Sequence, residues 1–215
     1  MYRYFITGTD TDVGKTIVCA ALACALEEAG RKPTIVKLVQ TGLTPSQEGD
    51  AQRAERLSGV RARECARYAL PADPWSAALD AGCEAPRVAE LATSLASIAG
   101  SLVVEGAGGL LVPLNESESL ADLARAADLE VLVVVGLKLG CINHARLTLE
   151  AAERRGLRMA GVLLCQRYGG VPERYLEHVT RALQGNVAIL GNLPFASAES
   201  ASVAAGARLL APLAR

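Results

Sequence analysis

The sequence predicts one α/β domain, residues 1–215, built on a mainly parallel, doubly wound β-sheet with helices on both faces. Short aliphatic segments alternate about six times with amphipathic helical segments, as in parallel strands joined by crossover helices. The strand segments are apolar throughout, so both faces of the sheet are expected to be buried. No linker, internal repeat or low-complexity segment marks a second domain.

The expected elements follow from hydrophobic periodicity and from glycine and proline at their ends. Strands are expected at residues 4–6, 34–39, 101–105, 130–137, 160–164 and 187–190. Helices are expected from residue 17 to 30, over 50–57 and 86–98, within 115–128, up to 155, and over 172–183 and 199–210. Residues 71–75 are expected to form a loop, and so are residues 191–195.

Composition narrows the class of protein. A net charge of −1 with 21% charged residues predicts no basic surface, so no nucleic-acid partner is expected. No apolar run approaches the roughly 20 residues that cross a bilayer. The first strand begins near the N-terminus without a signal-peptide pattern, and we expect a cytoplasmic protein with no membrane partner.

Six scattered cysteines form no C-x-x-C pair, which favours buried reduced thiols over a zinc site.

The segment Gly8-Thr9-Asp10-Thr11-Asp12-Val13-Gly14-Lys15-Thr16 joins the first strand to the first helix. This order is typical of the phosphate loop of P-loop NTPases. Backbone N–H groups and the helix N-terminus would bind phosphate, Lys15 would add charge, and Thr16 would hold magnesium. The common pattern has glycine where this chain has Thr9. The alternative is a tight turn with an incidental lysine, but the flanking strand and helix favour the phosphate loop.

Three later segments place polar groups where a strand meets a loop. Lys37 precedes Gln40-Thr41-Gly42; it is either a lysine that reaches to solvent or a cation aimed at phosphates. Glu105 precedes Gly106-Ala107-Gly108-Gly109, where it either supports magnesium or is a solvated charge at the strand end. The segment Lys138-Leu139-Gly140-Cys141-Ile142-Asn143-His144 leads into a helix, which favours an anion site at the helix start.

Together these segments resemble the dethiobiotin synthetase family over residues 2–196, in the same order and at compatible spacing. The wider glycine spacing of the loop is that family's own form. The resemblance implies an ATP-dependent ring closure in biotin biosynthesis. CO2 adds to one amine of 7,8-diaminopelargonic acid, the carbamate attacks the γ-phosphate to release ADP, and the second amine closes the ureido ring and releases phosphate. It also implies a homodimer with the active site at the subunit interface.

The resemblance also implies residue roles. Lys15 and Lys37 would be catalytic, and Mg²⁺ would be held by Thr16, Asp50 and Glu105. The substrate would be bound by Thr11, Lys37 and Thr41, and by Leu139, Gly140, Cys141, Ile142 and Asn143 of the partner subunit. The nucleotide would be bound by Asp12, Val13, Gly14, Lys15, Thr16, Ile17, Asp50, Glu105, Gly106, Ala107, Gly108, Cys165, Gln166, Pro194, Phe195 and Ala196.

The chain departs from the family in two places. Leu38 replaces the usual proline after the strand lysine, and Cys165-Gln166 replaces an asparagine that reads the adenine edge. Cysteine cannot offer the paired donor and acceptor of an asparagine amide. The base is therefore expected to be read by Gln166 or by backbone near Pro194–Ala196.

Two other functions compete with this one. Partitioning and septum-positioning ATPases carry a lysine five residues before the loop lysine, where this chain has Asp10. They also use DNA or membrane contacts, for which no basic or amphipathic tail is evident. Amidotransferases of the cobyric-acid type usually carry a second domain with a cysteine nucleophile, for which 215 residues leave no room.

Overall fold

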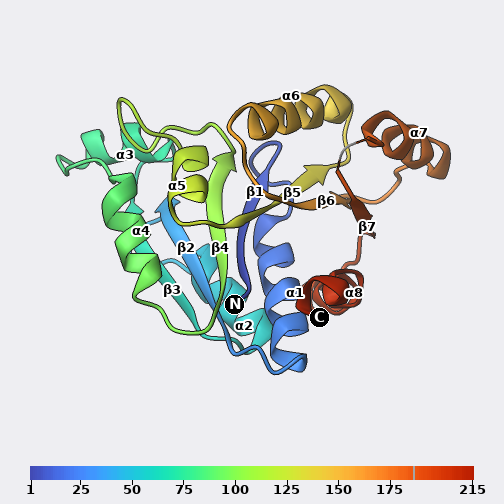
Figure 1. The fold of residues 1–215 in the computed structure, drawn as a ribbon, viewed down its shortest axis with the longest axis horizontal. Coiled ribbons are helices and arrows are strands. Elements are labelled where there is room, and N and C mark those ends of the chain that lie inside the picture. Colours follow the sequence, from blue (N-terminus) through green and yellow to red (C-terminus); the bar gives the residue numbers. More distant parts are fainter. Residues whose placement is uncertain (186) are drawn as a thin grey trace.

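The computed structural model describes residues 1–185 and 187–215, and its centre is one parallel β-sheet. The strand order is β3-β2-β4-β1-β5-β6-β7, with every neighbouring pair parallel (Figure 1). The strands are β1 (Arg3–Gly8), β2 (Pro33–Thr41), β3 (Ala62–Tyr68), β4 (Ser101–Gly109), β5 (Glu130–Gly136), β6 (Met159–Cys165) and β7 (Ile189–Leu193). Because all strands point the same way, their carboxyl ends meet along one edge of the sheet.

Helices cover both faces of the sheet, which confirms the doubly wound prediction. They are α1 (Lys15–Glu28), α2 (Asp50–Ser58), α3 (Pro74–Asp80), α4 (Val88–Ala96), α5 (Leu120–Ala126), α6 (Cys141–Arg154), α7 (Glu173–Leu183) and α8 (Glu199–Leu210), with a 3₁₀ turn at Ala211–Ala214. One hydrophobic core joins the sheet to α1, α2 and α8, and the other joins it to α4, α5, α6 and α7. The strands other than the edge strand β3 supply side chains to both cores, which explains their mainly apolar sequences.

Two elements were not predicted. Strand β3 has the sequence Ala-Arg-Glu-Cys-Ala-Arg-Tyr and pairs only with β2. An edge strand is part-exposed and can be polar, so the apolar pattern used to find strands did not mark it. The loop expected over 71–75 is wrong at its end, because Pro74 and Trp75 begin α3. Asp73 caps this helix by accepting a hydrogen bond from the backbone N–H of Ser76 at 3.0 Å.

Two strand ends were predicted too early, because the glycines that follow were expected to form turns. The residues after Glu105 were expected to turn, but β4 continues through Gly109, which pairs with Gly8 of β1. Strand β7 likewise includes Gly191 and Asn192, which were expected to lie in a loop. These glycines stay in the sheet because a neighbouring parallel strand pairs with each segment: Gly109 pairs with Gly8 of β1, and Gly191 pairs with Leu163 of β6.

All six cysteines are free thiols. Cys19, Cys141 and Cys165 are buried as expected, whereas the prediction of buried thiols is wrong for Cys65 and Cys83, which are exposed. Among the residues that the structure describes, no helix is both long enough and apolar enough to span a bilayer.

Candidate nucleotide and metal site

A cleft of about 300 Å³ lies at the carboxyl edge of the sheet, beside the loop that joins β1 to α1. Half of the predicted site residues line it: Thr11, Asp12, Gly14, Lys15, Thr16, Ile17, Lys37, Thr41, Asp50, Glu105, Ala107 and Gly108. They come from the loop between β1 and α1, from the first turn of α1, from β2 and β4, and from the first turn of α2. The fold thus brings together segments that are far apart in the sequence.

The backbone of the predicted phosphate loop explains where its glycines lie. A Cβ atom on Gly8 would lie 2.6 Å from the carbonyl oxygen of Asp10, so only glycine fits at this position. Gly14, which precedes α1, has a φ of 105°, in the left-handed region that favours glycine. The alternative of a turn with an incidental lysine is disfavoured, because Lys15 curls back over the loop and donates to the Asp10 carbonyl at 2.9 Å.

Lys15 is held in an environment that favours an anionic ligand. Its side chain is buried at the N-terminus of α1. Burial, and then the positive charge of Lys37, lower the pKa of Lys15 below its usual range. A phosphate bound in the loop would relieve both effects, since it would place a negative charge beside the ammonium group.

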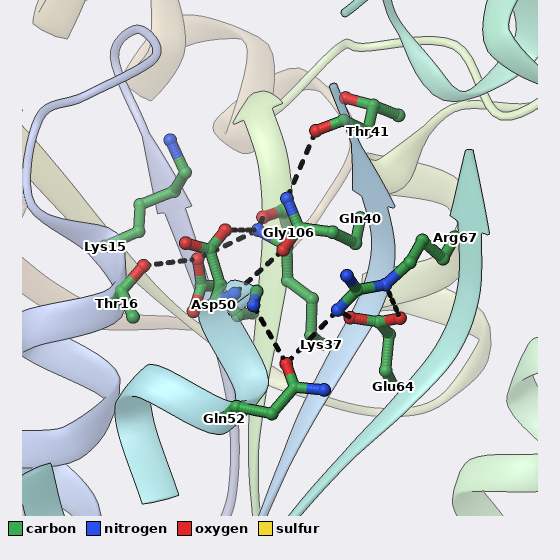
Figure 2. A network of polar contacts seen from close by, with 12 residues as sticks. Lys15, Thr16, Lys37, Gln40, Thr41, Asp50, Gln52, Glu64, Arg67 and Gly106 are labelled. Atoms are coloured by element: carbon green, nitrogen blue, oxygen red, sulfur yellow. Dashed lines mark hydrogen bonds and ion pairs between the residues drawn. The ribbon is translucent and has the colours of Figure 1, made fainter. Parts of the chain in front are cut away.

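Lys37 is the centre of a buried ionic cluster (Figure 2). Its Nζ lies 2.7 Å from Asp50 Oδ2 and 2.9 Å from Glu105 Oε1, and it donates to the Gly106 carbonyl at 3.1 Å. Thr16 Oγ1 donates to the same Glu105 oxygen at 3.0 Å. Both Lys37 and Glu105 are buried, so neither the solvent-reaching lysine nor the solvated strand-end carboxylate describes this site.

The charges in the cluster stabilise one another. Burial disfavours the charged form of Lys37, but attraction to Glu105 and Asp50 outweighs burial and raises the pKa of Lys37. Burial likewise opposes ionisation of Asp50, and the charge of Lys37 outweighs it, so the pKa of Asp50 is lowered. At neutral pH Lys37 is therefore an ammonium ion and Asp50 a carboxylate.

The oxygen atoms of the cluster fit a magnesium ion. Among the residues that the structure describes, Glu105 Oε2 is buried and has no hydrogen-bond partner, so one ligand oxygen is unpaired there. Asp50 and Glu105 both contact Lys37 Nζ, and the Thr16 hydroxyl contacts Glu105. Carboxylate and hydroxyl oxygens are the kind of ligand that Mg²⁺ prefers. Over the described chain, no group of three or more His, Cys, Asp or Glu could hold a metal. Thr16, Asp50 and Glu105 therefore suit an ion that takes few protein ligands and completes its coordination shell with water and phosphate.

The residues expected to meet the base lie at the ends of β6 and β7. The backbone N–H of Gln166 donates to the Leu193 carbonyl at 2.9 Å, which brings the two strand ends together. Pro194 and Phe195 are exposed beside them. Cys165 instead lies beneath the phosphate loop, where a Cβ on Gly14 would be 2.7 Å from its Sγ. Burial raises the pKa of the Cys165 thiol to about 11.

The segment that begins α6 does not line the cleft of its own chain. Lys138 pairs with Asp10 of the phosphate loop, with 2.5 Å between Nζ and Oδ2. Leu139 is 94% exposed, whereas Cys141 is buried. The substrate-binding role of residues 139–143 in a partner subunit stays a prediction.

Several residues of the cleft were not among the predicted ones: Val39, Gln40, Leu43, Arg53 and Arg167. Arg53 carried a signal in the sequence, because it lies three residues after Asp50 and so shares its helix face. It forms an ion pair with Glu199 at the start of α8. Arg167 follows β6 and carried no comparable signal, since its position depends on how the loop after β6 folds.

Comparison with known proteins shows the family of this chain. A family model described as an AAA domain matches residues 2–201. The ATP-dependent dethiobiotin synthetase of Rhodococcus jostii is 41% identical over 209 residues, covering 94% of this chain and 90% of that protein. The chain belongs to this AAA-domain family and, within it, to the dethiobiotin synthetases. The dethiobiotin synthetase of Anaeromyxobacter dehalogenans is 46% identical over 170 residues, 76% of each chain.

Solved structures with a different printed function share the fold of this dethiobiotin synthetase family member. The septum site-determining protein MinD from Pyrococcus horikoshii, complexed with Mg-ADP, superposes with a TM-score of 0.62. The match covers 100% of this chain and 95% of MinD at 18% identity. At this identity the likeness shows a shared fold alone.

Proposed function

We propose that this protein is an ATP-dependent dethiobiotin synthase of biotin biosynthesis, with 7,8-diaminopelargonic acid, CO2 and ATP as substrates. The observation that carries the proposal is a second buried lysine, Lys37, whose ammonium lies beside the phosphate loop and between Asp50 and Glu105. A nucleotide-binding site alone requires only the loop lysine. A second buried cation beside the γ-phosphate position suits transfer of the phosphoryl group to an acidic acceptor such as a carbamate.

The chain supplies charge and position for the reaction. Lys15 holds the β- and γ-phosphates over the loop, and Lys37 stabilises the carbamate and the charge that develops on the transferred group. Thr16, Asp50 and Glu105 would hold Mg²⁺, which when bound would neutralise phosphate charge. No side-chain general base is required, because the second amine can pass its proton to the released phosphate as the ring closes. Neither histidine lines the cleft.

The proposal includes a second subunit. Thr11 and Thr41 lie at the cleft, where they would hydrogen-bond the carbamate or the diamine end of the substrate. The substrate carboxylate would be bound at the start of α6 of the partner, by residues 139–143, where backbone N–H groups and the helix dipole favour an anion. The enzyme would act as a homodimer in the cytoplasm, where its ATP is supplied.

The test is a direct assay. The protein is incubated with Mg-ATP and bicarbonate, with and without diaminopelargonic acid, and phosphate release and product mass are measured. We expect phosphate release that depends on the diamine, and a product that has gained the ureido carbonyl. Phosphate release that is independent of the diamine, or a diamine recovered unchanged, would reject this function.

A further inference from the structure

We propose that Gln40 and Arg67 are positioning residues that hold Asp50 at the metal and phosphate side of the cleft. This inference rests on the proposed role of Asp50 as a magnesium ligand. Gln40 lies at the end of β2, and Arg67 lies on the edge strand β3 (Figure 2). Neither residue belongs to the predicted set of phosphate or metal ligands.

Gln40 fixes the backbone of Asp50. Its side chain is buried, with 6% exposed, and its Oε1 accepts a hydrogen bond from the Asp50 N–H at 2.8 Å. Its Nε2 donates to the Thr41 carbonyl at 3.1 Å, which orients the amide. Asp50 is the first residue of α2, and the preceding residue, Gly49, has no side chain with which to cap the helix. Gln40 therefore acts as the cap from a neighbouring strand.

Arg67 fixes the segment that leads into α2. Its Nη1 donates to the carbonyl oxygens of Thr44 and Gln47, at 2.9 Å and 2.8 Å. Its Nη2 donates to Gln52 Oε1 at 3.2 Å, and that oxygen also accepts from the Gly49 N–H at 3.1 Å. Every guanidinium nitrogen is thus engaged, because Nε and Nη2 also bind the carboxylate of Glu64 at 2.7 Å and 2.9 Å.

Gly49 shows how closely these groups converge. A Cβ at this position would lie 2.4 Å from Arg67 Nη2, 2.9 Å from Gln52 Oε1 and 3.1 Å from Gln40 Oε1. The three side chains meet around one backbone position directly before Asp50. Residues 44–48 of this segment are exposed and form no helix or strand, so these contacts replace regular structure in holding it.

The arrangement matters because the Asp50 carboxylate comes from a loop-to-helix junction, whereas Thr16 and Glu105 come from a buried helix and strand. A metal ligand must be held within a fraction of an ångström, and groups behind a ligand tune metal affinity. Lysine cannot replace Arg67, since an ammonium group lacks the planar fork that reaches the carboxylate and two carbonyls together.

The test measures the magnesium dependence of nucleotide binding. ADP binding is titrated by calorimetry over a range of Mg²⁺ concentrations and in EDTA, for wild type, Arg67→Lys, Gln40→Leu, Asp50→Asn and the Arg67→Lys/Asp50→Asn double variant. We expect Arg67→Lys and Gln40→Leu to raise the Mg²⁺ concentration for half-maximal binding about tenfold. Binding of metal-free ADP should change less than about twofold. The double variant should need no more Mg²⁺ than Asp50→Asn, because Arg67 acts through Asp50.

Arg155→Lys is the matched control, since Arg155 forms a 2.8 Å ion pair with Asp122 that is remote from Asp50 in sequence and lies outside the cleft. Gln40→Leu keeps the side-chain volume and carries the test if Arg67→Lys fails to fold. Mg²⁺ requirements within twofold of wild type for both variants would overturn the inference. Losses of ADP affinity that are equal with Mg²⁺ and in EDTA would overturn it as well.

The Asp50→Asn variant separates the two roles. If Asp50→Asn shifts the Mg²⁺ requirement and the other variants do not, only the positioning inference fails. If Asp50→Asn has no effect, the metal role of Asp50 fails with it, while the diamine assay still decides the overall function.

Discussion

The ammonium group of Lys37 shows how one residue can join the charge balance of the fold to the chemistry of the site. It neutralises the buried carboxylate of Glu105 and the part-buried carboxylate of Asp50, which lie 2.9 Å and 2.7 Å from its Nζ. A buried pair that loses one partner is left with an uncompensated charge, which is far more costly than an exposed one. The same cation is available to developing charge when a nucleotide and an acidic acceptor lie in the cleft.

Replacing Lys37 by glutamine should lower kcat by about 10²-fold or more, because one charged group at the phosphoryl acceptor is lost. Nucleotide binding should largely persist, since Lys15 and the loop backbone remain. Diamine-dependent phosphate release and the Kd of Mg-ADP are the two measurements, with the exposed Lys32→Gln as control. Unchanged turnover in the Lys37 variant would assign this lysine a structural role only.

Lowering the pH should reduce the free energy of unfolding of the metal-free protein, because Asp50 becomes protonated. Its pKa is lowered in the folded state, so its contribution to stability is present above the ordinary aspartate pKa near 3.8 and is lost as pH falls through the lower folded value. Lys37, with a raised pKa, keeps its contribution throughout the neutral range. Urea unfolding of wild type and Asp50→Asn between pH 6 and about 3 measures this. The variant should show the shallower decline, and parallel declines would contradict the assignment.

Cys165 should not select the base. Its thiol packs beneath Gly14, and the neighbouring Gln166 is the residue that lies at the joined ends of β6 and β7. Cys165→Ala should leave the order of KM for ATP, CTP and GTP unchanged, whereas Gln166→Ala should alter it if its side chain reads the base. A changed order in Cys165→Ala would mean that the thiol reaches the base. Unchanged orders in both variants would assign base reading to backbone near Pro194–Ala196.

At the scale of elements, the position of the phosphate loop depends on how helix α1, which follows it, is packed. Helix α1 is buried along most of its length, between the sheet and α8. Its contact with α8 depends on small side chains, because a Cβ on Gly206 would lie 2.8 Å from the Cβ of Ala21. A close helix pair of this kind holds Lys15 and Thr16 at the start of α1.

Gly206→Leu should therefore destabilise the protein by about 1–3 kcal/mol, because the added side chain forces the two helices apart. Ala204→Leu is the matched control: it adds a similar side chain on the same helix at an exposed position, and its effect should stay within about 0.5 kcal/mol. The free energy of unfolding in urea measures both. Equal effects of the two variants would show that the α1–α8 contact is not tightly packed.

At the scale of the whole molecule, the cleft and the start of α6 make a complete site only in the proposed dimer. Leu111 and Leu147 line one shallow apolar groove on the α6 side and are 50% and 57% exposed, while Leu139 is almost fully exposed. Exposed apolar residues near a predicted substrate-binding segment are consistent with a face that meets a second subunit.

Mixing two inactive variants tests this shared site. Lys37→Gln removes a group from the cleft, and Asn143→Ala removes one from the segment expected to serve the partner's cleft. Each homodimer should be impaired, but a mixed dimer keeps one intact site, so reassembled mixtures should recover about a quarter of wild-type activity. Sedimentation should give twice the 22.4 kDa of one chain. A monomer, or no recovery on mixing, would place the whole site in one chain.

Much of this architecture could be predicted from the sequence, because parallel strands and their crossover helices leave strong apolar patterns. The phosphate loop, Lys37 and Glu105 were found for the same reason, since each interrupts an apolar strand or follows one. The limits were polar or glycine-rich segments. Strand β3 forms because it pairs with β2 at the edge of the sheet. Residues 106–109 belong to β4 because of pairing with β1 rather than because of their own conformational preferences.

The order of residues by itself determined the fold class and the phosphate loop, because local apolar patterns and glycine positions encode them. The tertiary structure alone decided what Lys37 touches, where Cys165 lies, and that Gln40 and Arg67 converge on the residue before Asp50. These contacts join residues that are far apart in the chain, such as Lys37 and Glu105, which are 68 positions apart. No local pattern records them, since they arise only when parallel strands bring their carboxyl ends to one edge.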